Sequence, residues 1–207
     1  GDVYKRQPKD FDTNALFYNK EIFDNAGVAY PTDDWTYDDL LACCQELIDK
    51  GLGEGVYPFA CPVDFQTWYY QTVYANGGYI LNEDATETGY DLPETQEGIQ
   101  CWIDMIEKGY APSLNDINDT NADARFQSGH LAMNLAGSYM VAEYLQNDAI
   151  IGKIDCVEVP AFNGKEPNCI NGLSYSVYAN SKNLEEAKKF AVWMGSAEAM
   201  EIQGQNA

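Results

Sequence analysis

Aromatic rings occur together with amide and carboxylate side chains at two places in this sequence, the runs 64–68 and 134–139. A flat ring can cover the apolar face of a small polar ligand, while Asp, Asn or Gln hydrogen-bonds its rim. A sugar ring has such faces and such a rim, so these residues could bind a carbohydrate in a desolvated cleft. The predicted ring residues are Phe65 or Trp68 together with Tyr139, and the predicted rim residues are Asp64, Gln66 and Asn134.

Tyr139 stands out because of the segment that presents it. The sequence predicts a turn at Ser128-Gly129, a buried strand over 131–135 and a second turn at Gly137-Ser138. Open α/β sheets gather ligands at the ends of their strands. The Tyr139 ring is therefore either a ligand platform or a packing plug, and Trp68 likewise either contacts ligand or packs in the core.

Catalytic and metal-binding patterns are weak in comparison. His130 is the only histidine, no GxSxG motif accompanies it, and no pair of acids is singled out for hydrolysis. The oxygen-rich run 115–123 resembles a calcium loop but lacks its central Gly and distal Glu, which favours a solvated loop. No phosphate-binding glycine motif is present. We therefore predict no catalytic residue, no metal and no cofactor.

The charge balance limits the class of partner. The chain has 33 acidic and 12 basic residues and a formal net charge of -21. Nucleic acids and anionic lipids both require a basic surface, so neither is an expected partner. Neutral or cationic ligands remain compatible with this charge. Six cysteines without a CxxC motif are expected to be mostly buried, and Cys156 with Cys169 is the pair to test for a disulfide in an exported protein.

Strand-like and helix-like segments alternate along the chain, which predicts an α/β fold. A strand is expected at 14–18, a helix after the capping pair Thr36 and Asp39, and another strand at 56–60. Residues 1–7 do not match the composition of the rest and are interpreted as a non-native leader. The Pro-, Gly- and Asn-rich loop 160–168 is the predicted boundary between two lobes.

Five short motifs appear in a fixed order and together resemble extracellular solute-binding protein family 1, the sugar receptors of ABC importers, which includes maltose-binding protein. They comprise Asn14, Asn19-Lys20, Phe23 and Gly27; Pro31 with 35–40; Asn76-Gly77-Gly78; Phe126 with Ser128-Gly129, Ala132-Met133 and Gly137-Ser138-Tyr139; and Ala187, Phe190, Ser196 and Glu198. The resemblance covers residues 8–207.

This resemblance implies a type II periplasmic-binding-protein-like fold with two lobes. Residues 8–159 are expected to form most of the C-terminal-type lobe, and 160–207 the incomplete return of the N-terminal-type lobe. Both ends are expected to be truncated. By position in the family pattern, ligand-binding residues are expected at Tyr139 after the Gly137-Ser138 turn, at Phe65, at Asp12 and at Asn171-Gly172. Asp64 and Trp68 complete the predicted binding set from their own chemistry, as argued above.

The expected function is that of an extracellular or periplasmic bacterial receptor, not an enzyme. It delivers sugar to ABC permease subunits through ligand-stabilised lobe closure. It is expected to be monomeric and to meet the membrane only through a lipid anchor outside this chain. The alternatives are the same fold with a cationic or other non-sugar solute, a carbohydrate-active hydrolase, and an interaction module without a small ligand.

Overall fold

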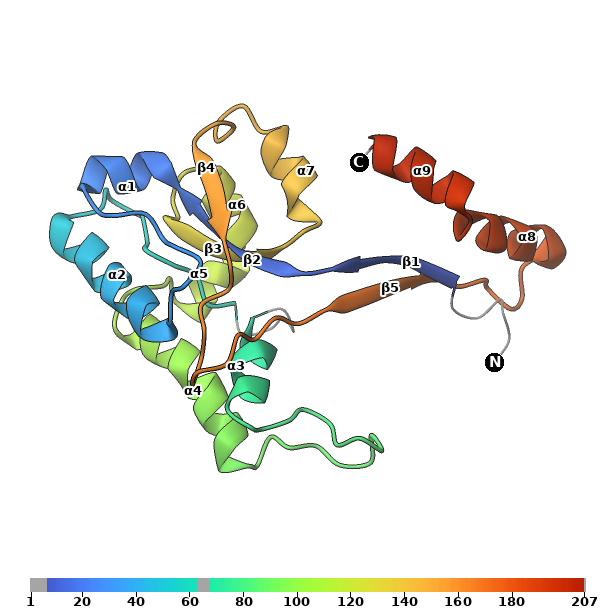
Figure 1. The fold of residues 1–207 in the computed structure, drawn as a ribbon, viewed down its shortest axis with the longest axis horizontal. Helices are drawn as coiled ribbons and strands as arrows, with labels where there is room; N and C mark the ends of the chain where they lie inside the picture. Colours follow the sequence, from blue (N-terminus) through green and yellow to red (C-terminus); the bar gives the residue numbers. More distant parts are fainter. Residues whose placement is uncertain (1–6, 63–67, 207) are drawn as a thin grey trace. The chain divides into compact units, whose positions relative to one another are not determined.

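The computed structural model describes residues 7–62 and 68–206, which form two compact units. The larger unit is Thr13–Cys169, and the smaller unit combines the described residues before Thr13 with those from Ile170 onward (Figure 1). The chain therefore passes between the units twice. The chain divides after Asp12 and after Cys169, because strand β1 (Gln7–Asp12) pairs with strand β5 (Asn171–Tyr175), and the second division directly follows the predicted boundary loop 160–168.

The larger unit is built on a three-stranded antiparallel sheet in the order β3-β2-β4. Its strands are β2 (Asn14–Asn19), β3 (Met133–Gly137) and β4 (Ile154–Val157). The register places Asn14 opposite Gly137 and Leu16 opposite both Leu135 and Val157. This pairing places β3, the predicted strand before Tyr139, next to β2, which carries Asn14 and Asn19 of the first family motif.

Helices cover both faces of this sheet. Because side chains alternate along β2, Leu16 and Tyr18 enter one buried cluster and Phe17 enters another. The first cluster includes α1, α2 and α4, and the second includes α6 and α7. The helices are α1 (Lys20–Ala26), α2 (Tyr37–Lys50), α3 (Tyr69–Ala75), α4 (Pro93–Glu107), α5 (Leu114–Asp119), α6 (Ala122–Gln127) and α7 (Met140–Leu145). The layered arrangement confirms the α/β class.

The smaller unit pairs β1 (Gln7–Asp12) with β5 (Asn171–Tyr175) in antiparallel register, with Asp12 opposite Asn171. Two helices follow, α8 (Leu184–Met194) and α9 (Ala197–Asn206), and each buries one alanine, Ala191 and Ala199. A two-stranded sheet is marginally stable alone, so the packing of α8 against β1 supports it.

Local signals in the larger unit are confirmed where side chains satisfy the backbone. Thr36 and Asp39 form a reciprocal capping box at the start of α2. Gly27 ends α1 with φ of 66°, a conformation that favours glycine.

Two local predictions are wrong. Residues 56–60 form a single bridge, Tyr57 to Leu131, followed by a bend at Pro58, rather than a strand, and Pro58 has no N–H to continue a ladder. The run 115–123 is not a loop throughout, because Ser113 caps helix α5 and Ile117 is buried beneath it. Part of this run therefore lies on a helix.

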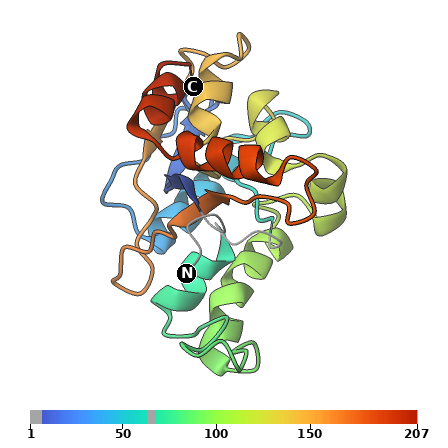
Figure 2. The same ribbon diagram turned by 90° about the vertical axis from the view of Figure 1, so that its right-hand side faces the viewer.

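Gly98 allows α4 to pack closely against α3, and the two helices lie side by side in Figures 1 and 2. A Cβ at Gly98 would lie 2.7 Å from the Cα of Val73. Thr72 Oγ1 donates to the Gly98 carbonyl at 2.5 Å and accepts from Trp102 Nε1 at 2.8 Å. The close approach therefore positions α3.

We expect Gly98→Val to lower the free energy of unfolding by about 3 kcal/mol, because the clash is with backbone that cannot repack. Chemical denaturation measures this change. Gly53→Val is the matched control, since a Cβ at Gly53 would meet only Val56 Cγ2, at 3.6 Å. Equal stability of the two variants would contradict the close packing of α3 and α4.

Candidate functional site

Tyr139 lies where β3 ends and α7 begins. The turn before it is held by a hydrogen bond from the Ser138 N–H to the Thr13 carbonyl, 2.8 Å long. The Tyr139 side chain is 44% exposed, whereas its neighbours Gly137 and Met140 are buried. The ring is therefore partly open to solvent, and its role as a ligand platform stays a prediction.

Gly137 is required by the ring rather than by the backbone. Its φ is not in the left-handed region, but an added Cβ would lie 2.3 Å from Tyr139 Cε1. The ring of Tyr139 therefore lies over Gly137, and it can do so because Gly137 has no side chain.

A cavity of about 220 Å³ opens between Tyr139 and Trp68. It is lined by Pro62, Trp68, Ile117, Asn118, Asn121, Ala122, Asp123 and Tyr139. Cavities that hold whole drug-sized ligands measure about 300–1,000 Å³, so this one suits a single small ring. Trp68 is only 7% exposed and belongs to the first core cluster. Trp68 therefore packs in the core and also forms one wall of the cavity, and its contact with a ligand stays a prediction.

Asp123 supplies the carboxylate of this cavity, and buried neighbours fix its orientation. Its Oδ1 accepts hydrogen bonds from the Tyr144 hydroxyl at 2.8 Å and from Asn134 Nδ2 at 2.9 Å. Asn134 Nδ2 also donates to the Tyr144 oxygen at 3.1 Å. Oδ2 accepts no hydrogen bond from the part of the chain that the structure describes. One oxygen is thus held while the other remains available to a ligand.

Two amides complete the polar lining. Asn121 Oδ1 caps α6 by accepting from the Ala124 N–H at 2.8 Å, which leaves the Asn121 Nδ2 donor for the cavity. Asn118 is exposed on α5 and has no hydrogen bond to another described side chain. The cavity therefore offers donors and acceptors beside two aromatic rings.

Burial raises the pKa of Asp123 above its ordinary value of 3.8, although the hydrogen bonds from Tyr144 and Asn134 oppose the shift. A carboxyl whose folded pKa is raised stabilises the fold most below its unfolded pKa. This contribution is lost as the pH rises through the raised pKa.

We therefore expect Asp123→Asn, which keeps an acceptor for both donors, to become more stable relative to the unaltered protein as the pH rises from 4 to 7. Thermal melting across that range measures the difference. Melting curves that shift in parallel at every pH would show that the Asp123 carboxyl is not desolvated.

The other predicted site residues are distributed differently. Asp64, Phe65 and Gln66 lie outside the described residues. Asn134 is fully buried, so it does not lie at the rim of the cavity as predicted. It instead holds Asp123 through a hydrogen bond. Asp12, Asn171 and Gly172 belong to the smaller unit, where Asp12 is 6% exposed and paired with Asn171. The structure thus brings together Tyr139, Gly137 and Trp68, and adds Asp123, Asn118 and Asn121, which the sequence interpretation placed in a solvated loop.

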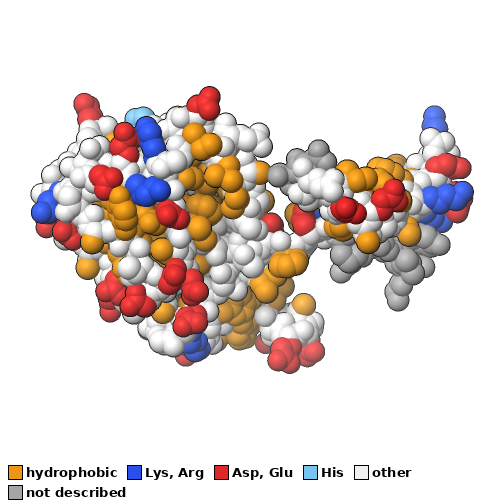
Figure 3. All heavy atoms as spheres, turned by 45° about the horizontal axis from the view of Figure 1, so that its top comes forward, with side chains coloured by type: hydrophobic (Ala, Val, Ile, Leu, Met, Phe, Trp, Pro, Cys, Tyr) orange, Lys and Arg blue, Asp and Glu red, His pale blue; other side chains and the backbone are white. Residues whose placement is uncertain are grey.

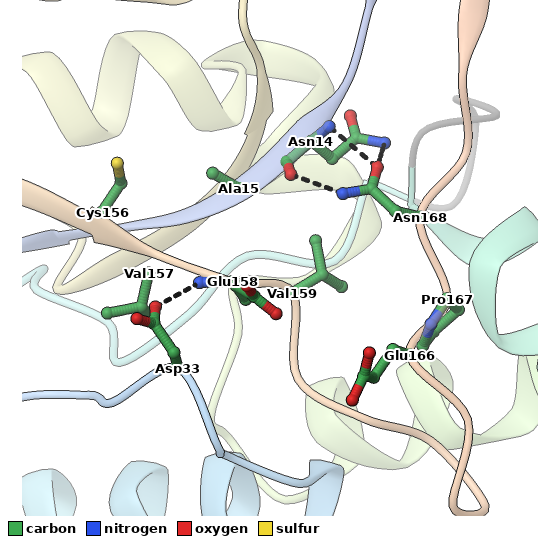
Figure 4. A pocket seen from close by; sticks show the side chains of 10 residues that line it. All are labelled: Asn14, Ala15, Asp33, Cys156, Val157, Glu158, Val159, Glu166, Pro167 and Asn168. Carbon is green, nitrogen blue, oxygen red and sulfur yellow. Dashed lines mark hydrogen bonds between the residues drawn. The ribbon is translucent and has the colours of Figure 1, made fainter.

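A second cavity, of about 500 Å³, lies beside β4 (Figure 4). Asn14 and Asn168 form a reciprocal pair at its edge: the Asn14 N–H donates to Asn168 Oδ1 at 3.0 Å, and Asn168 Nδ2 donates to the Asn14 carbonyl at 2.9 Å. Carboxylates of Asp33, Glu158 and Glu166 line this cavity, and among the described residues no aromatic ring does. It is larger than the Tyr139 cavity but lacks the surfaces that bind a sugar face.

The described part of the chain contains neither a disulfide nor a group of side chains suited to a metal ion. The described cysteines are free, including the candidate pair Cys156 and Cys169. Burial raises the pKa of Cys43 to about 12, which makes that thiol unreactive. Within residues 7–62 and 68–206, no cluster of three or more His, Cys, Asp or Glu residues could hold a metal ion. None of the helices described there is long and apolar enough to span a membrane.

The surface of the larger unit carries more Asp and Glu than Lys and Arg on the face seen in Figure 3. This agrees with the net charge of -21. The acidic groups are spread over that face, whereas Asp123 is the only acidic residue that lines the described Tyr139 cavity.

Comparison with known proteins adds the family context. The model of the bacterial extracellular solute-binding protein family matches residues 2–201. An ABC substrate-binding protein from Listeria monocytogenes, solved with cycloalternan, is 32% identical with a TM-score of 0.75, over 94% of this chain and 49% of that one. The GacH receptor of Streptomyces glaucescens, solved unliganded and with acarbose, is 27% identical with a TM-score of 0.74, over 92% and 48%.

A galactooligosaccharide-binding protein of Bacillus subtilis is 28% identical over 203 residues, which are 91% of this chain and 44% of that protein. The chain thus spans about half the length of the relatives that it matches.

Proposed function

This chain belongs to the bacterial extracellular solute-binding protein family, and from that premise we propose that the full-length protein is a carbohydrate receptor of an ABC importer. The observation that carries the proposal is the Tyr139 cavity, where two rings, one oriented carboxylate and two amides converge. Its ligand is a neutral sugar or oligosaccharide.

The polar groups of the cavity can pair with the hydroxyl groups of a sugar. Asp123 Oδ2 accepts from a hydroxyl, and Asn121 Nδ2 donates to one. A sugar satisfies both because each hydroxyl is donor and acceptor. The exposed ring of Tyr139 covers an apolar face of the same sugar.

In the full-length protein, ligand binding shifts the population from the open to the closed arrangement of the two lobes, and transport depends on this shift. A ligand that contacts two lobes stabilises their closed arrangement, and the permease subunits bind that closed arrangement. We propose that the receptor is a monomer on the outer side of the cytoplasmic membrane. It is there either free in the periplasm or attached to the membrane by a lipid anchor. The matching family is one of extracellular solute-binding proteins, which supports this location.

We assign no catalytic step to the site. The family and the proteins compared above are binding proteins of transporters. A hydrolase of the retaining or inverting kind uses two carboxyl groups across the scissile bond, whereas Asp123 is the one acid among the described lining residues. Incubation of an oligosaccharide with the protein should therefore release no new reducing ends.

The experiment that tests the proposal is a thermal-shift screen of the full-length protein with neutral mono- and oligosaccharides, and with putrescine and spermidine as cationic solutes. A ligand that binds only the folded state raises the melting temperature in proportion to the logarithm of its concentration. A shift with at least one neutral saccharide is expected. A shift only with the polyamines would favour the cationic alternative.

A further inference from the structure

Tyr144 on α7 is fully buried, and two other aromatic rings hold its ring in place. Phe17 meets it edge to face and Phe126 meets it at a tilt, each with ring centroids 5.2 Å apart. These contacts involve the ring and do not require the hydroxyl group. The hydroxyl nevertheless has a polar partner in the core, because it donates to Asp123 Oδ1 at 2.8 Å.

Tyr144 does not itself belong to the Tyr139 cavity. It is absent from the lining residues, whereas Asp123 is one of them. Asn134 on β3 is likewise fully buried, and its Nδ2 donates both to Asp123 Oδ1 and to the Tyr144 oxygen. A ligand in the cavity can therefore contact Asp123, while Tyr144 acts on that ligand only through Asp123.

The charge of Asp123 depends on the same contacts. Burial raises the pKa of the Asp123 carboxyl, and the hydrogen bonds from Tyr144 and Asn134 lower it. The negative charge of Glu143 on α7 adds to the upward shift of this pKa. Loss of the Tyr144 hydroxyl would remove the larger of the two stabilising hydrogen bonds, so the carboxyl would ionise only at a higher pH.

No cation of the described residues neutralises Asp123, which forms no ion pair with them. Arg125 on the same helix instead donates to the backbone carbonyls of Asp116 and Thr120, at 2.8 and 3.0 Å. Helix α5 contributes only uncharged side chains to the cavity, and Tyr139 is the other titratable residue among the described lining. The two hydrogen bonds to Oδ1 are therefore what favours the ionised form of Asp123.

We propose that Tyr144 is a positioning residue of the sugar site, whose hydroxyl keeps Asp123 oriented and ionised so that the carboxylate accepts a hydroxyl of the saccharide. This inference rests on the proposed function and adds a residue that controls the site from the core. A carboxylate accepts more strongly than a neutral carboxyl, because charge-assisted hydrogen bonds are about twice as strong as neutral ones. Saccharide affinity therefore falls as the pH falls through the pKa of Asp123.

Calorimetric titration of the full-length protein and of Tyr144→Phe with gluco- and galacto-oligosaccharides of two to four rings, between pH 4 and 8, tests the inference. Phenylalanine keeps the ring contacts and removes only the donor to Asp123. We expect affinity near neutral pH to fall by about three- to tenfold, the effect of one hydrogen bond. The loss of affinity on acidification should begin at a higher pH in Tyr144→Phe.

Tyr110→Phe is the matched control. Tyr110 is also buried, but its hydroxyl donates to Gln45 Oε1 at 2.7 Å and it does not line the cavity. This variant should change neither the affinity nor its pH profile. Carbon-13 NMR of the ligand-free protein, labelled at the aspartate carboxyl carbons, follows the titration of Asp123 without any sugar, and Asp123→Asn assigns the signal. The Asp123 titration should move to higher pH in Tyr144→Phe alone.

Saccharide binding with the same pH profile and the same Asp123 titration in Tyr144→Phe would overturn the inference and leave the proposed function standing. An affinity loss that is equal at every pH, with an unchanged Asp123 titration, would show a merely structural role and would also overturn it. If none of the oligosaccharides binds the unaltered protein, the proposed function fails and the inference fails with it, whatever the NMR titration shows.

Discussion

We expect replacement of Tyr139 by alanine to lower the affinity of the full-length protein for the proposed saccharide ligand by about tenfold to a hundredfold. The ring is 44% exposed and lies over Gly137, so its loss removes ligand contact area without opening the core. Covering an aromatic side chain contributes about 1.5–3 kcal/mol, and each 1.4 kcal/mol is tenfold in affinity. Titration calorimetry measures the loss, and thermal melting checks that the fold is retained.

Gly137→Ala is a second way to disturb the same platform. Its new methyl group meets the Tyr139 ring, which is exposed and can move aside. We expect weaker sugar binding with nearly unchanged stability, although the ring itself is retained. Tyr139→Ala that unfolds the protein, or that leaves affinity intact, would return Tyr139 to the role of a packing residue.

The second large effect is expected from Asp123→Asn, which should lower sugar affinity by about tenfold or more. The amide keeps an acceptor for Tyr144 and Asn134 but replaces the carboxylate oxygen that accepts no hydrogen bond from the described residues. A hydrogen bond to a charged group contributes about 1.5–3 kcal/mol. The measurement is again the dissociation constant, at a pH where the carboxyl is ionised.

Asp119→Asn is the matched control because Asp119 is exposed at the end of α5 and does not line the cavity. It makes the same change in net charge and should leave affinity unchanged. Equal losses in both variants would indicate a general effect of the acidic surface, and no loss in Asp123→Asn would remove Asp123 from the site.

The sequence predicted the features that local chemistry determines. The alternation of apolar segments predicted helices and strands, and the Thr36–Asp39 pair predicted the start of α2, which the structure confirms. The position of Tyr139 at the end of a strand was also predictable, because the strand and the glycine turn are adjacent in the chain.

Features that depend on distant contacts could not be predicted in the same way. Asp123 is oriented by Tyr144 on α7 and Asn134 on β3, and nothing in the acidic run around Asp123 indicates those partners. The many polar residues of that run suggested a loop, whereas part of the run belongs to helix α5, which buries Ile117. The unit boundary likewise depends on the pairing of β1 with β5, segments separated by most of the chain.

The most direct test of the central claim is competition calorimetry on the full-length protein and on Tyr139→Ala, with neutral saccharides and with spermidine at one ionic strength. We predict saturable binding of a neutral saccharide that is weakened at least tenfold in Tyr139→Ala and is not displaced by spermidine. Saturable binding of spermidine that is unchanged in Tyr139→Ala, with no saccharide bound, would contradict a carbohydrate site at Tyr139.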